Sequence, residues 1–201
     1  MVTKIYLIRH GETEDADEKR YKGHIDVPLS KNGIEQIKRV SEHVRKLAGS
    51  QVTAVYCSGL SRAVKSAEII AEPFGIKPVI VEALKERNFG AWEGMSFDEI
   101  RDKYPGAFKA WADNPLRFSP MGGESTIDVS ERAVKIFDEL TGRHEGESIA
   151  IVAHGGINRV ILCDQLGIPL ENIFRIEQDY AAVNVIEKWD YPVIKHLNMV
   201  V

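Results

Sequence analysis

Short apolar runs rich in β-branched residues alternate along the chain with longer stretches of helical periodicity. Four of the runs are residues 4–8 (KIYLI), 52–57 (VTAVYC), 78–82 (PVIVE) and 148–153 (SIAIVA). Runs of this length without polar alternation are typical of strands that are buried on both faces of a parallel sheet. The sequence therefore predicts a parallel sheet that helices cover on both sides.

The stretches between these runs place apolar side chains three and four residues apart, which is typical of amphipathic helices. We expect helices over residues 31–48, 59–73, 126–141 and 157–166. Ser30 and Ser58 are the expected N-caps of the first two helices, and Gly167 is expected to end the last one. This alternation of strands and helices predicts an α/β fold with three layers.

Two further apolar runs lie near the C-terminal end, at residues 181–187 (AAVNVIE) and 193–197 (VIKHL). The WDYP segment between them has the composition of a turn. We therefore expect the two runs to form an antiparallel hairpin.

Length and charge exclude several classes of partner. The chain has 201 residues, enough for one domain with a sizeable core, and a net charge of −4 with acids and bases mixed. This charge argues against nucleic acid or an anionic membrane as the main partner. No apolar run approaches the ~20 residues of a membrane span, and the N-terminal segment is too short and interrupted for a signal peptide. We therefore expect a cytoplasmic protein.

Cys57 and Cys163 are the only cysteines, and both lie in apolar contexts. We expect two buried, reduced thiols. No cluster of cysteine and histidine has the spacing of metal ligands, so no metal site is predicted.

Residues 89–122 interrupt the alternation and contain 7 of the chain's 16 aromatic residues. Pro105, Pro115 and Pro120 favour several short helices over one long helix. The segment is interpreted either as a satellite core under a long connection or as a lid-like insertion that shapes a pocket. The two interpretations are compatible.

Charged and imidazole side chains follow the predicted strands at their carboxyl ends. Arg9 and His10 end the first run, and His154 follows the fourth. Arg62 lies one turn into the helix after the second run, and Glu86 follows the third. Ligands of α/β sheets bind beyond the carboxyl ends of the strands, and a helix N-terminus beside an arginine is an anion site. These five residues are therefore the candidate site.

A single histidine at the end of a strand is more often a packing residue than a catalyst. Two such histidines, each followed by glycine and accompanied by arginines, favour a catalytic site for an anion. Gly11 is expected to let a backbone N–H approach the ligand. The remaining histidines are interpreted as structural: His24, His43, His144 and His196.

Several segments together resemble the histidine phosphatase superfamily, also called phosphoglycerate mutase-like. They are LIRHGET, RYKGHIDVPLSKNG, CSGLSRAVKSAEIIA, LKERNFGAWEG, GGES and IVAHGG, within a match that runs from residue 5 to about residue 188. Residues 152–187 are most similar to the α-ribazole phosphatase branch. The resemblance implies a three-layer α/β/α sandwich whose mostly parallel central sheet has one antiparallel strand. It also implies a single domain over residues 1–201, with residues 89–122 as a lid-like insertion.

The resemblance implies roles for individual residues. His10 would be the nucleophile that forms a phosphohistidine, and Glu86 would act as acid and base in turn. Arg9, Arg62 and His154 would surround the phosphoryl oxygens during catalysis. Four further residues would help bind the phosphate: Gly11, Lys22, Gly23 and Gly155. No metal or cofactor is required, because the cationic side chains neutralise the phosphate.

One position departs from the family pattern. Members often carry an asparagine three residues after RHGET that helps to hold the phosphate, and Ala16 stands at this position here. Lys19, Arg20 or Lys22 could supply the missing donor. A weaker grip on phosphate and a different substrate are the alternatives.

The sequence thus predicts a metal-independent phosphomonoester hydrolase that acts on a small phosphorylated metabolite, with α-ribazole 5′-phosphate as the family-level candidate. Two alternatives stay open. A phosphoglycerate mutase shares the same residues but keeps the phosphoryl group, and a non-catalytic phosphate-binding protein would be consistent with Ala16. Oligomeric state is not readable from the sequence, and a homodimer is left open.

Overall fold

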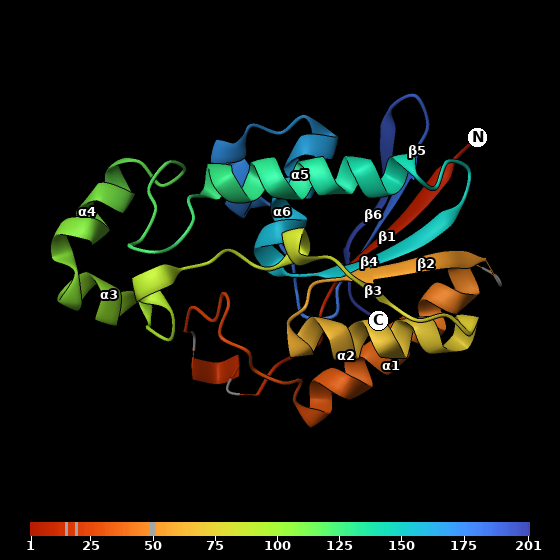
Figure 1. The fold of residues 1–201 in the computed structure, drawn as a ribbon, viewed down its shortest axis with the longest axis horizontal. Coiled ribbons are helices and arrows are strands. Elements are labelled where there is room, and N and C mark those ends of the chain that lie inside the picture. Colours follow the sequence, from red (N-terminus) through yellow and green to blue (C-terminus); the bar gives the residue numbers. More distant parts are fainter. Residues whose placement is uncertain (15, 19, 49–50) are drawn as a thin grey trace.

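A six-stranded sheet forms the centre of the computed structural model, which describes residues 1–14, 16–18, 20–48 and 51–201 (Figure 1). Its strands are β1 (Thr3–Arg9), β2 (Val52–Cys57), β3 (Val79–Ile80), β4 (Ser148–Ala153), β5 (Val183–Lys188) and β6 (Pro192–Met199). Their order across the sheet is β3-β2-β4-β1-β5-β6. β5 runs against its neighbours β1 and β6, whereas the remaining neighbours pair in parallel. The predicted sheet with one antiparallel strand is confirmed.

Helices cover both faces of this sheet. α1 (Lys31–Ala48) and α2 (Ser61–Ala71) lie on one face, and α5 (Thr126–Gly142) and α6 (Gly155–Leu166) lie on the other (Figure 1). The shorter helical segments are η1 (Ala16–Glu18), η2 (Glu72–Phe74), η3 (Glu82–Leu84), η4 (Gly90–Trp92), α3 (Phe97–Lys103), α4 (Pro105–Asp113) and η5 (Leu170–Arg175). Among the described residues, no helix combines the length and apolar character that crossing a membrane requires.

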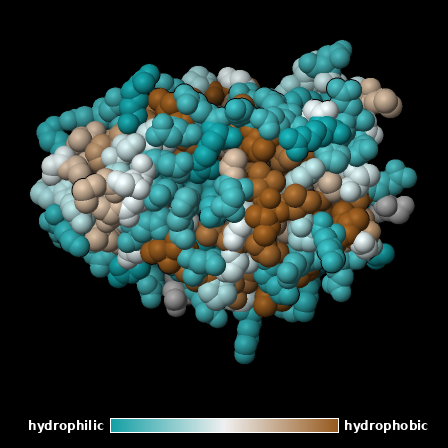
Figure 2. Space-filling model, in the orientation of Figure 1, coloured by the Kyte–Doolittle hydropathy of each residue, from teal (hydrophilic) through white to brown (hydrophobic). Residues whose placement is uncertain are grey.

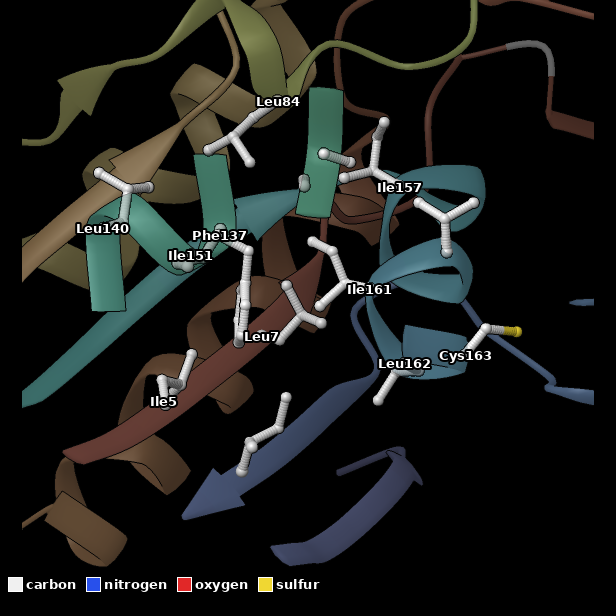
Figure 3. Packing of buried hydrophobic residues seen from close by; sticks show 14 of the residues in the cluster. Ile5, Leu7, Leu84, Phe137, Leu140, Ile151, Ile157, Ile161, Leu162 and Cys163 are labelled. Carbon is white, nitrogen blue, oxygen red and sulfur yellow. The ribbon is translucent and has the colours of Figure 1, made fainter. Parts of the chain in front are cut away.

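β1 joins the two hydrophobic layers, because successive side chains of a strand point to opposite faces. Ile5 and Leu7 pack on the side of α5 and α6, in a cluster that includes Phe137 (Figure 3). Tyr6 and Ile8 belong to the cluster on the side of α1 and α2. All four β1 side chains are completely buried. Burial of each aliphatic side chain stabilises the fold by roughly 1.5–3 kcal/mol.

Most of the predicted elements are confirmed. α1, β2 and β4 have the predicted bounds, and β5 and β6 form the predicted antiparallel hairpin. The Ser30 hydroxyl accepts the Gly33 N–H at 2.9 Å and so caps α1 as expected. α6 ends at Gly167, whose φ of 62° lies in the left-handed region that glycine adopts easily.

The prediction of a buried strand over residues 78–82 is wrong. Only Val79 and Ile80 form a strand, and their side chains are 50% and 55% exposed. β3 lies at the edge of the sheet, where it pairs with β2 alone. Figure 2 shows a hydrophobic patch in the region where Figure 1 places this strand. An apolar run alone does not distinguish a central strand from an edge strand.

The predicted start of the second helix is also wrong. α2 begins at Ser61, with Leu60 as its N-cap, and Ser58 does not cap it. A carboxylate oxygen of Asp26 instead accepts both the backbone N–H and the hydroxyl of Ser61, each at 2.8 Å. The hydroxyl of Ser58 bonds to His154, far away in the sequence.

Residues 89–122 form short helices, as the prolines predicted. Pro105 is the first residue of α4, and a capping box of Ser96 and Glu99 begins α3. Phe97 packs edge-on against Phe108 and Trp111, from α4, with ring centroids 4.9 and 5.9 Å apart. Figure 1 shows α3 and α4 at one end of the molecule, beyond the sheet. The aromatic cluster is present, and its role as a lid stays a prediction.

The start of α1 and the segment after β1 lie so close together that glycine is required at both. A Cβ at Gly33 would lie 2.0 Å from the Glu12 carbonyl oxygen, and one at Gly11 would lie 2.4 Å from the Gly33 carbonyl oxygen. Backbone atoms cannot yield as a flexible side chain can. Gly11 therefore sets the path of the chain immediately after His10.

We predict that Gly33→Ala destabilises the protein although alanine is the better helix former. Overpacking should lower the free energy of unfolding by roughly 1–3 kcal/mol. Gly142→Ala is the matched control, because it also lies in a helix and a Cβ there meets nothing within 4 Å. The control should be neutral or stabilising by up to about 1 kcal/mol. Denaturant unfolding measures both, and equal stability of the two variants would contradict the packing account.

Candidate active site

Two buried histidines meet at the carboxyl ends of the central strands. Arg9 pairs with Ala153 in the parallel ladder of β1 and β4, so the next residues, His10 and His154, emerge side by side. Their ring centroids are 5.0 Å apart, and the side chains are 5% and 1% exposed. Strand register thus brings together two imidazoles that are far apart in the sequence.

Two arginines flank this pair. Arg9 comes from the end of β1 and Arg62 from the first turn of α2. Both line one cavity of about 230 Å³ together with His10, His154, Lys22 and Glu86. We call this cavity the cationic pocket. Guanidinium and imidazole N–H donors around such a volume match the oxygens of a phosphate.

His10 is neutral and has a defined tautomer. Burial lowers its pKa well below the usual 6.5, and the positive charges of Arg9 and Arg62 lower it further. Its Nδ1 lies 2.7 Å from the Gly11 carbonyl oxygen. Because a carbonyl only accepts, we assign the proton to Nδ1. The lone pair of Nε2 is then available as a nucleophile.

His154 is neutral for the same reasons. Burial lowers its pKa well below 6.5, with further lowering by His10 and both arginines. Its Nε2 lies 2.7 Å from the Ser58 hydroxyl, which also accepts the Leu60 N–H at 3.4 Å. We assign Ser58 as the donor to Nε2, which leaves the proton of His154 on Nδ1. Within the described part of the chain Nδ1 has no hydrogen-bond partner, so it can donate to a ligand.

Glu86 reaches the cationic pocket from the segment after η3. Its Oε1 accepts the Arg87 N–H at 2.8 Å, and its Oε2 accepts the Gly156 N–H at 2.9 Å. Gly156 lies in the first turn of α6. These two bonds fix the carboxylate at the edge of the pocket.

The comparison with known families identifies the chain. The model of the histidine phosphatase superfamily (branch 1) matches residues 5–198. The chain belongs to this superfamily.

Phosphatases are among its relatives. Phosphoserine phosphatase 1 of Hydrogenobacter thermophilus is 30% identical over 92% of this chain and 86% of its own length. A putative α-ribazole-5′-P phosphatase from Escherichia coli superposes with a TM-score of 0.89 at 25% identity, covering 98% of this chain and 96% of its own. Bacillus stearothermophilus YhfR also gives 0.89, at 31% identity, with coverages of 99% and 98%. The family recognised in the sequence is confirmed, and the chain is a phosphatase.

The loop before α1 supplies one further cation of this histidine phosphatase. Lys22 lines the cationic pocket beside Ala16 and donates from Nζ to the Glu14 carbonyl oxygen at 2.8 Å. Arg20 also lines the pocket, but its guanidinium is paired with Glu99. The third candidate to replace the family's asparagine, Lys19, lies outside the described residues. Lys22 and Arg20 thus both lie at the pocket, and which residue replaces the asparagine stays a prediction.

Of the three glycines predicted to bind phosphate, one lines the cationic pocket and two do not. Gly23 lines the cationic pocket, and its carbonyl oxygen accepts an N–H of Arg62 at 2.7 Å. Gly11 and Gly155 are not among the residues that line it. The Gly11 N–H points to the Ser66 hydroxyl at 3.3 Å, so the structure does not support the expected approach of this N–H to a ligand.

Tyr180 and Gln178 are site residues that the sequence reasoning missed. The Arg9 guanidinium carbon lies 3.9 Å from the Tyr180 ring centroid, and Arg9 donates to the Gln178 carbonyl oxygen at 2.5 Å. Asn184 on β5 exchanges two side-chain hydrogen bonds with Gln178. Tyr180 and Gln178 come just before β5, which neighbours β1, and this was the signal that could have identified them. Using that signal requires the order of the strands in the sheet, which the sequence does not reveal.

Glu93 was missed as well. Its carboxylate accepts the backbone N–H groups of His24 and Ile25, both at 2.7 Å. The Arg62 guanidinium donates to the carbonyl oxygens of Gly23 and Ile25. Glu93 therefore shapes the loop that holds Arg62 in place. The His24 ring also lies beside the site, 2.9 Å from the Glu86 carbonyl oxygen.

The neutral histidines predict a specific dependence of stability on pH. A histidine whose pKa is depressed in the folded state binds a proton more readily in the unfolded chain, where its pKa is about 6.5. Its full contribution to stability is therefore present above pH 6.5 and is lost as the pH falls below that value. His10→Gln keeps a donor for the Gly11 carbonyl but cannot titrate. Between pH 7.5 and pH 5 the variant should lose about 2 kcal/mol less unfolding free energy than the unsubstituted protein. Equal losses in urea titrations at the two pH values would contradict a neutral His10.

Proposed function

We propose that this phosphatase hydrolyses small phosphomonoesters without a metal ion, through a phosphohistidine on His10. One observation carries the proposal: the cationic pocket holds a neutral imidazole, with its Nε2 lone pair available, among two guanidiniums and beside a carboxylate. A nucleophile of this kind divides one displacement into two easier steps.

In the first step the Nε2 lone pair of His10 attacks phosphorus, and the bond from phosphorus to the alcohol oxygen breaks. Glu86, in its protonated form, gives its proton to that oxygen, so the alcohol leaves neutral. The products are the alcohol, phosphohistidine and the Glu86 carboxylate.

In the second step a water attacks the phosphohistidine. The Glu86 carboxylate accepts a proton from the water, and the bond from phosphorus to Nε2 breaks. Inorganic phosphate leaves, and His10 returns to its neutral form. The two steps together convert the ester and one water into the alcohol and inorganic phosphate, and both His10 and Glu86 return to their starting forms.

The charges around the phosphoryl group support both steps. Arg9 and Arg62 stabilise the negative charge on the equatorial oxygens, and the His154 Nδ1–H donates to one of them. Lys22 adds a third positive charge at the wall where Ala16 lies. These groups do the neutralising that a metal ion would do elsewhere.

The names of relatives suggest several substrates. Similar solved structures include the putative α-ribazole-5′-P phosphatase from Escherichia coli and the α-ribazole phosphatase from Shigella flexneri. Other relatives are named for phosphoserine, including a metal-independent phosphoserine phosphatase of Arabidopsis thaliana that is 36% identical over 80% of this chain and 67% of its own length. A small phosphorylated metabolite is the class they share, and α-ribazole 5′-phosphate stays our candidate within it. The cytoplasmic location and the homodimer stay predictions.

We predict that His10→Ala abolishes phosphate release from simple phosphomonoesters, lowering kcat/KM by about 10³-fold or more. The unsubstituted protein should retain labelled phosphate in an acid-labile, base-stable form, and EDTA should leave its activity unchanged. His196→Ala is the control, because this residue is exposed on β6. Activity that survives His10→Ala, or that EDTA abolishes, would overturn the proposal. Phosphoryl exchange between glycerate positions without net release would favour a mutase.

We predict that Glu86→Gln discriminates between leaving groups. Phenyl phosphate needs a proton on its departing oxygen, whereas 4-nitrophenolate departs without one. Loss of the acid should therefore slow phenyl phosphate by about 10²–10⁴-fold and 4-nitrophenyl phosphate by less than about tenfold. Single-turnover measurements isolate this step. An equal effect on both esters would assign Glu86 to positioning alone.

A further inference from the structure

A second cavity, of about 220 Å³, adjoins the cationic pocket. The two cavities share three lining residues, Tyr21, Glu86 and Phe89. The other walls of the second cavity come from η4, α3, α4, α5, α6 and η5. Its volume corresponds to roughly seven water molecules at about 30 Å³ each. We call it the aromatic cavity because of its lining.

The lining is mostly apolar and combines buried with exposed side chains. Trp92, Ile100 and Val160 line the cavity and are at most 5% exposed. Phe97 and Phe174 also line the cavity and are 44% and 76% exposed. Exposed large aromatic side chains are unfavourable in water, and here two of them line the same cavity.

Glu86 links the aromatic cavity to the reaction, an inference that depends on the proposed function. The carboxyl group must contact the alcohol oxygen in order to protonate it. Since Glu86 lies at the junction of the two cavities, an alcohol whose oxygen touches it has the aromatic cavity directly beside its carbon skeleton. The phosphate then occupies the cationic pocket.

The charges in the aromatic cavity exclude some alcohols. Arg87 and Arg159 are the basic residues that line it. Thr126 adds a hydroxyl to the wall. Arg87 is held by the carbonyl oxygens of Glu124 and Phe118 and by the Thr126 hydroxyl. An ammonium group would lose its hydration and meet two positive charges there. A flat apolar ring would gain contact with aromatic walls.

We propose that the aromatic cavity is a subsite for an aromatic ring carried by the alcohol of the phosphate ester. The substrate class is therefore aryl-bearing phosphomonoesters, including nucleoside-like ones. Aminoalkyl esters without a carboxylate, such as phosphoethanolamine, are poor substrates. The specificity residues are aromatic side chains of the lining, above all Trp111 and Phe174.

Two esters with the same type of leaving group test this subsite. 2-Phenylethyl phosphate and ethyl phosphate both release a primary alcohol, so chemistry alone should not separate them. We expect kcat/KM to be at least about tenfold higher for the phenylethyl ester, with phosphoethanolamine below both. Equal values for the two alkyl esters would overturn the subsite.

Trp111→Ala should reduce this preference to about twofold, measured as the ratio of the two kcat/KM values. Trp189→Ala is the matched control, because Trp189 lies in the turn between β5 and β6 and is 55% exposed. The control should keep the full ratio. If Trp111→Ala does not fold, Phe174→Ala provides the same test at a more exposed position. An unchanged ratio in the folded variant would overturn the proposal.

Calorimetric binding to His10→Ala separates the subsite from the proposed catalysis. This variant cannot turn over the esters, and it should bind 2-phenylethyl phosphate at least about tenfold more tightly than ethyl phosphate. Equal affinity, or no binding of either ester, would overturn the subsite. Failure of the unsubstituted protein to release phosphate from any ester would overturn the hydrolase proposal, while the binding result would still decide the subsite.

Discussion

The parallel pairing of β1 with β4 is the constraint on which the site depends. Their register places His10 and His154 next to each other at one end of the sheet, where both side chains are almost completely buried. Two protonated imidazoles could not coexist there with Arg9 and Arg62. The fold therefore keeps both rings neutral, which is the state that the nucleophile requires and in which His154 still has one N–H to donate.

Buried positive charge must be compensated, and backbone oxygens contribute much of that compensation. Burial lowers the pKa of Arg9 and Arg62, yet both donate to main-chain carbonyls, those of Gln178 for Arg9 and of Gly23 and Ile25 for Arg62. A carbonyl stabilises a guanidinium without forming an ion pair with it. The cations thus keep their net charge for an anionic ligand, and their positions are set before it binds.

The sequence predicted what depends on local pattern and on strand ends. The bounds of α1, β2 and β4 followed from periodicity, and residues at strand ends indicated both histidines and Arg9. The predictions that were wrong, the Ser58 cap and the buried strand over residues 78–82, depend on which segments are neighbours in space. The partner of Ser58 lies 96 residues away, and the exposure of β3 follows from its place at the sheet edge. Tyr180 became a site residue only because β5 neighbours β1.

The aromatic region is joined by hydrogen bonds to residues 20–25, the loop segment that precedes α1. The Tyr21 N–H donates to the Met95 carbonyl at 3.0 Å, and the Gly94 N–H donates to the Tyr21 carbonyl at 2.8 Å. Arg20 adds an ion pair to Glu99 on α3. The same loop provides the Gly23 carbonyl that Arg62 binds. With the proposed subsite, a shift of α3 on binding an aromatic group would be transmitted through this loop toward Arg62, and recognition of the alcohol would be coupled to recognition of the phosphate.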